Sequence, residues 1–285
     1  MAEANKQKRK ISAGTWIALV LALVLIVELG VVGFNAASSL KARAAVNLTQ
    51  VQASELTQGV TLYELGKNFQ VDHDFLVGLM ALSQQDINAV RLPIDVSDHI
   101  TVDGGKASLD SQWLWQIASL SEMIFQSEYR VILSLAFPEE MDITPQAYES
   151  MWKQMNEAFG HRPAAELWYE LLIMDGHQGD AWDAVRSSII ESMRATNPDR
   201  QILLTLPDPS NQQDLTAAGE LCKAHDLHLA SYAREDMDSA ILEKMGEITF
   251  QNDVTAILIE PEDAQKDYTK AMAEAYDFGC MLQGD

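Results

Sequence analysis

Residues 130–173 read RVILSLAFPEEMDITPQAYESMWKQMNEAFGHRPAAELWYELLI, and this stretch decides the fold. It begins with an apolar run at 130–137 that has the character of a buried strand, and it ends with a second such run at 165–173. Between them, Thr144 precedes Pro145, a favourable helix start because threonine can cap and proline is tolerated at the first helical position. An apolar stripe then follows at helical spacing: Tyr148, Met151, Trp152, Met155 and Phe159. The stretch therefore predicts a strand, a helix and a second strand.

The same alternation continues on both sides of this unit. Further strands are expected at 59–65, 87–94, 201–207, 228–235, 255–262 and 280–285, with helical patterns between them. Strands without a polar face that are separated by helices imply a parallel sheet covered on both sides. Eight such units in about 230 residues fit a (β/α)₈ barrel of the TIM type. A doubly wound open sheet is the alternative, although no glycine-rich phosphate turn follows the first strand.

The last expected strand closes the printed sequence, so this pattern leaves the barrel without its eighth helix. We expect either residues 45–57 or another chain to cover that position.

The N-terminal region has the pattern of a membrane anchor. Basic residues between Lys6 and Lys10 precede the apolar run TWIALVLALVLIVELGVVGF, which is as long as the roughly 20 residues that cross a bilayer as a helix. Basic residues on the near side predict that the N-terminus stays in the cytoplasm. The expected organisation is a basic tail, a transmembrane signal-anchor, a stalk and an extracytoplasmic barrel, in the order 1–12, 13–34, 35–57 and 58–285. Cleavage as a signal peptide, which would leave the barrel secreted, is the alternative.

The barrel region is strongly acidic. The formal net charge is −22 although basic residues gather near the N-terminus, and such a surface repels phosphate backbones. We therefore expect no nucleic acid partner. Cys222 and Cys280 match no metal-binding spacing and are expected to be separate buried thiols. The pair His225 and His228 precedes a strand, at the end of a barrel opposite to its usual site, so neither a metal nor a cofactor is expected.

Function in such a barrel sits at the C-terminal ends of the strands. Carboxylates dominate there, with an arginine and a tyrosine among them, and the strand-end residues include Glu64, Arg91, Asp95, Glu139, Asp175, Asp208, Tyr232, Glu260 and Glu262. The sequence contains no Gly-x-Ser-x-Gly turn, no His-Glu-x-x-His pair and no phosphate loop.

Four segments carry a more specific likeness: INAVRLPID, LDSQWLWQIASLSEMIFQSEYRVILSLAF, AELWYELL and AVRSSIIESMRATNPDRQILLTLP. They resemble glycoside hydrolase family 5, the cellulase-like barrel enzymes, over about 59–285 and most strongly over 84–207. The resemblance implies a retaining enzyme for β-linked glucans or mannans. Such an enzyme uses two glutamates, an acid/base after the fourth strand and a nucleophile after the seventh, with carboxyls about 5–5.5 Å apart.

The resemblance can be carried over residue by residue. Arg91 matches the strand-two arginine of the family, Glu260 falls on the nucleophile, and Tyr232 represents the strand-six His-x-Tyr pattern. The strand-three histidine falls near Ala136 and is absent, and the strand-eight tryptophan has no clear counterpart. The Asn-Glu pair that supplies the acid/base falls on Ile173-Met174.

The missing acid matters because a glycosidic oxygen leaves poorly unless it is protonated, and general acid catalysis contributes about 10²–10⁴-fold. Asp175, one residue on, is the candidate substitute acid. We expect a catalytically impaired barrel that binds polysaccharide or oligosaccharide through Arg91, Tyr232 and Glu139, or that serves with a protein partner in an envelope or polysaccharide-related assembly. An active retaining endo-β-glycosidase with Glu260 as nucleophile is the alternative, and a purely structural membrane subunit is a third.

Tryptophans offer a further way to hold a sugar, because an indole can stack on its ring. Three candidates are Trp113, Trp115 and Trp168, and most are expected to be core residues.

Overall fold

A computed structural model describes most of the barrel region. The described residues are 58–69, 73–82, 87–137, 141–173, 179–206, 208–233, 237, 239–252, 256–260, 273 and 279–283. The chain divides into two compact units, Met1–Thr49 and Gln50–Asp285, and all described residues belong to the second. The predicted anchor at 13–34 and the stalk at 35–57 lie outside the described residues. Within the described part, no helix is long and apolar enough to cross a membrane.

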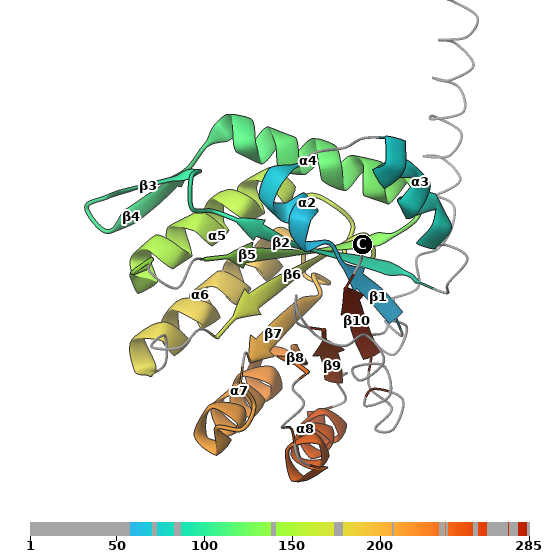
Figure 1. Ribbon diagram of the computed structural model, residues 1–285. Helices are drawn as coiled ribbons and strands as arrows, with labels where there is room; N and C mark the ends of the chain where they lie inside the picture. Colours follow the sequence, from blue (N-terminus) through green and yellow to red (C-terminus); the bar gives the residue numbers. More distant parts are fainter. Residues whose placement is uncertain are drawn as a thin grey trace, which may run out of the picture. The chain divides into compact units, whose positions relative to one another are not determined.

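Eight parallel strands close into a barrel (Figure 1). They are β1 (Gln58–Thr61), β2 (Ala89–Asp95), β5 (Arg130–Ala136), β6 (Leu167–Leu172), β7 (Ile202–Leu206), β8 (His228–Tyr232), β9 (Ala256–Ile259) and β10 (Gly279–Gln283). Each strand pairs with its neighbours along the chain, and β10 closes on β1. The predicted (β/α)₈ barrel is therefore confirmed, and closure excludes the doubly wound sheet.

Helices alternate with the strands and lie outside the barrel (Figure 1). They are α2 (Tyr63–Asn68), α3 (His73–Leu82), α4 (Ser111–Gln126), α5 (Pro145–Phe159), α6 (Asp180–Thr196), α7 (Gln212–His225) and α8 (Ser239–Asn252). The helix expected at 264–277 lies outside the described residues, apart from Ala273, and so does any segment that covers the eighth helical position.

The α5 helix forms for the reasons that the sequence indicates. The Thr144 hydroxyl accepts a hydrogen bond from the backbone N–H of Ala147, and Pro145 occupies the first turn. The apolar stripe is buried against the barrel, where the ring of Trp152 meets that of Tyr169 edge to face at 5.5 Å. Packing of this kind, repeated around the barrel, forms the core between strands and helices.

The inside of the barrel has its own small core. Its members are Ala89, Ile132, Trp168, Leu203, Ala230, Ile257, Ile259 and Met281, one or two from each of seven strands. Side chains two residues apart on a strand share a face, so the next inward positions are those two residues further on. On β2, β5, β6, β7 and β8 these positions are polar: Arg91, Ser134, Glu170, Thr205 and Tyr232. An apolar layer thus supports a polar layer nearer the C-terminal ends of the strands.

The first expected strand is too long. In the structure β1 ends at Thr61 and α2 begins at Tyr63, whereas the sequence pattern predicts a strand through residue 65. The apolar residues Leu62, Leu65 and Phe69 are spaced by three and four, so the segment satisfies a helical stripe as well as a strand pattern. Gly66 permits the helix to lie directly on β2, because a Cβ there would fall 2.0 Å from the backbone oxygen of Pro93.

A two-stranded hairpin was not predicted. It consists of β3 (Ile100–Asp103) and β4 (Lys106–Leu109), joined by Gly104 and Gly105, both at positive φ, as a tight hairpin turn requires. Two side chains of α5 hold it: the Ser150 hydroxyl and the Gln154 amide accept from and donate to the backbone of β4. The hairpin leads directly into α4 (Figure 1).

Cys222 and Cys280 are both buried and form no disulfide with each other, as expected. Burial raises the pKa of the Cys222 thiol to about 12, so this thiol stays protonated at neutral pH.

His228 is the first residue of β8 and is buried at the N-terminal end of that strand. Its burial makes the free energy of unfolding depend on pH. Its ring stacks on Trp168 at 5.3 Å, and Nε2 lies 2.7 Å from the side-chain oxygen of Gln201. Burial lowers the pKa of His228 to about 4, while the charge of Asp226 opposes this and that of Arg194 adds to it. An unfolded histidine titrates near pH 6.5, so the unfolded chain binds more protons between these values. The contribution of neutral His228 is present above pH 6.5 and is lost as pH falls toward 4.

We therefore expect the free energy of unfolding to fall by about 2 kcal/mol more between pH 7 and pH 5 in the native chain than in the variant His228→Gln. Urea unfolding at the two pH values measures this difference. His161→Gln is the matched control for replacing a histidine, because His161 is exposed. Equal pH dependence in His228→Gln and in the native chain would rule out this role.

Candidate functional site

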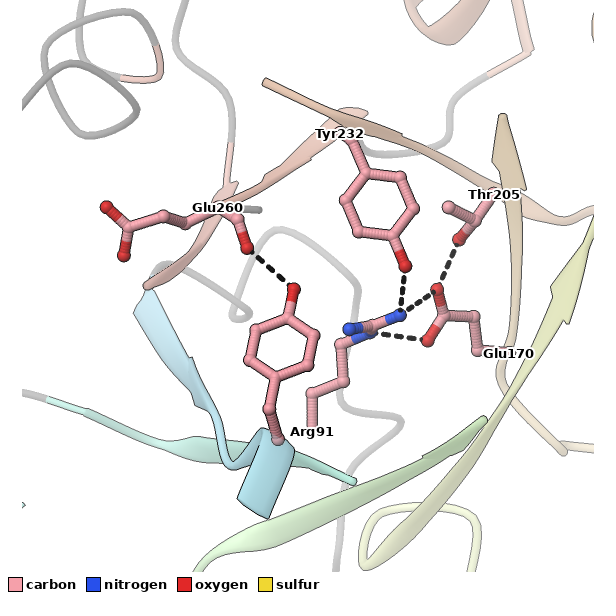
Figure 2. Close-up of polar contacts among 6 residues, drawn as sticks. Arg91, Glu170, Thr205, Tyr232 and Glu260 are labelled. Carbon is pink, nitrogen blue, oxygen red and sulfur yellow. Dashed lines mark hydrogen bonds and ion pairs between the residues drawn. The ribbon is translucent and has the colours of Figure 1, made fainter. Parts of the chain in front are cut away.

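An ion pair crosses the barrel interior above the apolar layer. Arg91 comes from β2 and Glu170 from β6, and both side chains are fully buried. The Arg91 Nε donates to Glu170 Oε2 at 2.6 Å, and Nη2 donates to Oε1 at 3.0 Å (Figure 2). This two-pronged geometry is the strongest form of arginine–carboxylate pairing.

Two neighbouring side chains complete the network. The Thr205 hydroxyl, on β7, donates to Glu170 Oε1 at 2.7 Å. Arg91 Nη2 donates to the phenolic oxygen of Tyr232, on β8, at 2.9 Å, and the guanidinium carbon lies 5.5 Å from the centre of that ring (Figure 2). The network therefore links side chains from four strands around the buried guanidinium of Arg91. Tyr232 is the half-buried member of the network.

The electrostatics of the network favour a fixed charge state. Burial by itself lowers the pKa of Arg91, but the opposite charge of Glu170 and its hydrogen bonds, with smaller contributions from Tyr232 and Tyr63, raise that pKa above its ordinary value. Arg91 is thus a permanent cation. Both oxygens of Glu170 already accept hydrogen bonds, so this carboxylate is committed to the pair rather than available to a substrate.

Glu260 lies at the end of β9 and is fully buried. Its backbone N–H donates to the Met281 oxygen at 2.7 Å, and its backbone oxygen accepts from the Tyr63 hydroxyl at 2.8 Å. In Figure 2 the Glu260 carboxyl points away from Arg91, Glu170 and Tyr232, while its backbone oxygen faces inward. The α2 helix, which carries Tyr63, therefore fixes the backbone of this residue.

Ile173 follows β6, where the family resemblance places asparagine. Its backbone N–H donates to the Thr205 oxygen at 2.9 Å, which continues the sheet by one residue. The side chain is 5% exposed and belongs to the core between strands and helices. Apolar packing thus occupies a position where the family keeps a polar amide. Three other residues named from the sequence, Met174, Asp175 and Glu139, lie outside the described residues.

The sequence pointed to Arg91, Tyr232 and Glu260, and the structure brings the first two into contact. Sequence reasoning did not assign Glu170 as the partner of Arg91, nor Thr205 as a third member. A signal was present: Glu170 is the one charge in the run LWYELLI, and a carboxylate buried in a strand requires a cation nearby. Within the described ranges, no three His, Cys, Asp or Glu side chains lie close enough to hold a metal ion.

Comparison with known proteins gives this geometry a family. The protein-family model named cellulase (glycosyl hydrolase family 5) matches residues 77–243, which is more than half of the chain. The chain belongs to glycosyl hydrolase family 5. The match includes β2, β6, β7 and β8, the four strands that carry the Arg91 network. A search of curated protein sequences gives no significant match.

Solved structures of family 5 enzymes share the fold. A broad-specificity endoglucanase from Clostridium acetobutylicum is 12% identical, with a TM-score of 0.60, and the alignment covers 81% of this chain and 88% of that one. The catalytic domain of a Thermobifida fusca endoglucanase, in complex with cellotetraose, is 12% identical with a TM-score of 0.58, covering 80% and 78%. A morphinone reductase reaches a TM-score of 0.52 at 10% identity, covering 80% and 82%. Shape alone therefore does not distinguish reactions within this fold.

Proposed function

We propose that this chain is a membrane-anchored, extracytoplasmic family 5 barrel that binds a glycan and has lost most or all hydrolytic activity. The observation that carries the proposal is the arrangement of two buried glutamates, Glu170 within β6 and Glu260 directly after β9. Glu170 is committed to Arg91, and the carboxyl of Glu260 points away from that pair (Figure 2). A retaining mechanism requires two carboxyls that face one substrate bond from about 5–5.5 Å apart.

The sequence supports the loss of the acid. Met174 stands where the family has its acid/base glutamate, and a thioether cannot donate a proton. The buried Ile173 beside it replaces the amide of the family motif with core packing. Tyr232 offers a different capability, because a half-buried aromatic ring with a fixed hydroxyl can stack on a sugar and hydrogen-bond to it. Binding is the function that these side chains retain.

The N-terminal sequence supports the membrane anchor in this proposal. An apolar segment at 13–34 behind basic residues favours a single-pass topology with the barrel outside the cytoplasm. In that setting the barrel would bind envelope or secreted polysaccharide, alone or within a protein assembly. Release of the chain from membranes by alkaline extraction would contradict the anchor.

Hydrolysis assays and calorimetry with the purified full-length chain test this function. We expect no release of reducing sugar from β-1,4-glucan or mannan, and the same result for Glu260→Gln. We expect measurable binding of cello- or manno-oligosaccharides that weakens about five- to ten-fold in Tyr232→Ala, since stacking on one ring is worth roughly 1–1.4 kcal/mol. Circular dichroism of each variant controls for folding.

An active retaining endo-β-glycosidase is the second candidate, because Glu260 occupies the nucleophile position of the family at the end of β9. Release of reducing sugar that Glu260→Gln abolishes would establish it and overturn the proposal. Loss of that activity in Asp175→Asn would then identify the substitute acid. Absence of both hydrolysis and oligosaccharide binding would leave the protein-assembly role as the better account.

A further inference from the structure

Trp115 differs from the other tryptophans of the barrel. The chain has six, and five of them lie in the described part. Trp113, Trp152, Trp168 and Trp182 are at most 8% exposed, whereas Trp115 on α4 is 68% exposed. Single exposed apolar side chains are common on protein surfaces, but the indole of Trp115 offers a large flat face to a ligand and has no role in the core.

The α4 residues next to Trp115 are polar but uncharged. The exposed neighbours on α4 are Ser111, Gln112 and Gln116, and Ser119 lies one turn further on. Glu122 is the single charged residue of the helix, and it pairs with Arg162. The other long helices α5, α6, α7 and α8 each carry several charges. On a chain with a net charge of −22, two helical turns without any charge form a distinct patch, here called the α4 patch (Ser111, Gln112, Trp115, Gln116 and Ser119).

The α4 patch is held rigidly. The Asp110 carboxylate caps the helix by accepting from the backbone N–H of Trp113 at 2.8 Å. The Trp113 ring, two residues before Trp115, is buried and stacks on His99 at 5.1 Å. A ligand that meets Trp115 therefore meets a helix whose first turn is already fixed, so little backbone entropy is lost on binding.

We propose that the α4 patch is a second glycan-binding site, specific for neutral polysaccharide and separate from the strand-end site at Tyr232. The indole face stacks on the C–H face of a pyranose ring, and the amides of Gln112 and Gln116 exchange hydrogen bonds with ring hydroxyls. The α4 helix begins after β2 and its hairpin, so its first turns lie toward the C-terminal end of the barrel, where the strand-end site is. A long glycan can contact both sites. Binding at the α4 patch does not require any residue of the strand-end site.

The other partner classes fit the α4 patch less well. An anionic lipid surface attracts basic residues, and α4 contains none. A stable protein interface has a contiguous apolar centre within about 800 Å² on each partner, whereas amides and hydroxyls surround this single indole. An acidic glycan would be repelled by the net charge of the chain. A neutral sugar polymer matches the size and the polarity of the patch.

Retention on insoluble polysaccharide tests the proposal with the full-length chain and its Trp115→Ala variant. Cellulose and insoluble mannan are the probes, and we expect the variant to bind one of them at least about ten-fold more weakly than the native chain. Phe250→Ala is the matched control, because Phe250 on α8 is 89% exposed and its removal should leave retention unchanged. Thermal unfolding should be the same for all three proteins, since neither side chain is in the core.

Fluorescence reports on the patch directly. Since the other described tryptophans are buried, neutral acrylamide should quench Trp115 preferentially, and the variant Trp115→Phe gives the background. Soluble glucan or mannan polymer should protect the native chain from quenching and leave Trp115→Phe unaffected. This holds even if short oligosaccharides fail to bind at Tyr232, so failure of the strand-end site is distinguishable from failure of the patch.

Three results would overturn the proposal. The first is equal retention of Trp115→Ala and Phe250→Ala, with the native level in both. The second is no retention of the native chain on either polymer. The third is unchanged acrylamide quenching in the presence of soluble polymer. A protein that co-purifies with the native chain and is lost in Trp115→Ala, without any glycan retention, would assign the patch to a protein partner instead.

Discussion

Replacement of Glu170 by leucine lowers the free energy of unfolding by about 3–5 kcal/mol, because it leaves a buried charge without its partner. The Arg91 guanidinium is fully buried and bonds to both oxygens of Glu170, so the variant Glu170→Leu must desolvate a cation with no counter-charge. The Thr205 hydroxyl loses its acceptor as well. Denaturant unfolding followed by tryptophan fluorescence measures the change.

A second variant separates the charge from the packing. Arg91→Met combined with Glu170→Leu removes both charges, and apolar replacement of a whole buried ion pair is often neutral or stabilising. We therefore expect the double variant to recover most of the stability that Glu170→Leu loses. The exposed pair Lys244–Glu247 on α8 is the control, since Glu247→Gln should cost no more than about 1 kcal/mol. A double variant as unstable as Glu170→Leu would contradict the electrostatic explanation.

This ion pair also bears on the order of the side chains around the strand-end site. A buried ion pair contributes little net stability relative to apolar residues of similar volume. Here it has a second effect, because Arg91 Nη2 also bonds the Tyr232 hydroxyl at 2.9 Å and thereby fixes the half-buried ring at the strand end. The double variant should accordingly fold well but bind oligosaccharide more weakly, a separation that pure stabilisation would not produce.

Much of the fold follows from periodicity in the sequence. Buried parallel strands are short runs without a polar face, and eight such runs are separated by helical patterns, so strand number and closure could be predicted. The hairpin β3–β4 could not, because its pattern is weak: one face of β3 and β4 is polar and its stability comes from Ser150 and Gln154 of α5, which are distant in sequence. Tertiary contacts, rather than local pattern, determine such an element.

The site shows the same division. Position along the strands identified Arg91, Tyr232 and Glu260 as strand-end residues, but their partners depend on which strands face one another across the barrel. The direction of the Glu260 side chain was partly accessible: Ile257 and Ile259 belong to the inner core, so the next residue of an ideal strand points outward. Resemblance to a family implied the role of the position, and the orientation of the Glu260 side chain came from the structure.

Replacement of Arg200 by methionine is the second large effect, with an expected loss of about 3 kcal/mol or more in the free energy of unfolding. Arg200 is 1% exposed and follows α6, at the end of the segment RATNPDR. Its guanidinium donates to four backbone oxygens of the chain that enters β6: those of Gly160 at 3.0 Å, Arg162 at 2.7 Å, Pro163 at 3.5 Å, and Leu167. It also lies 5.1 Å above the ring of Tyr169.

No methionine can replace these bonds, and buried carbonyls without donors cost about 1–3 kcal/mol each when water cannot reach them. Lysine keeps the charge but has a single nitrogen in place of the planar fork, so Arg200→Lys should fall between the native chain and Arg200→Met. Arg194→Met is the control: Arg194 donates to one oxygen, that of Asp226 at 2.7 Å in an exposed setting, and its loss should cost about 1 kcal/mol or less. If Arg200→Met unfolds at the same denaturant concentration as Arg194→Met, the four bonds do not determine how the chain enters β6, and packing of Trp152 on Tyr169 would have to do so.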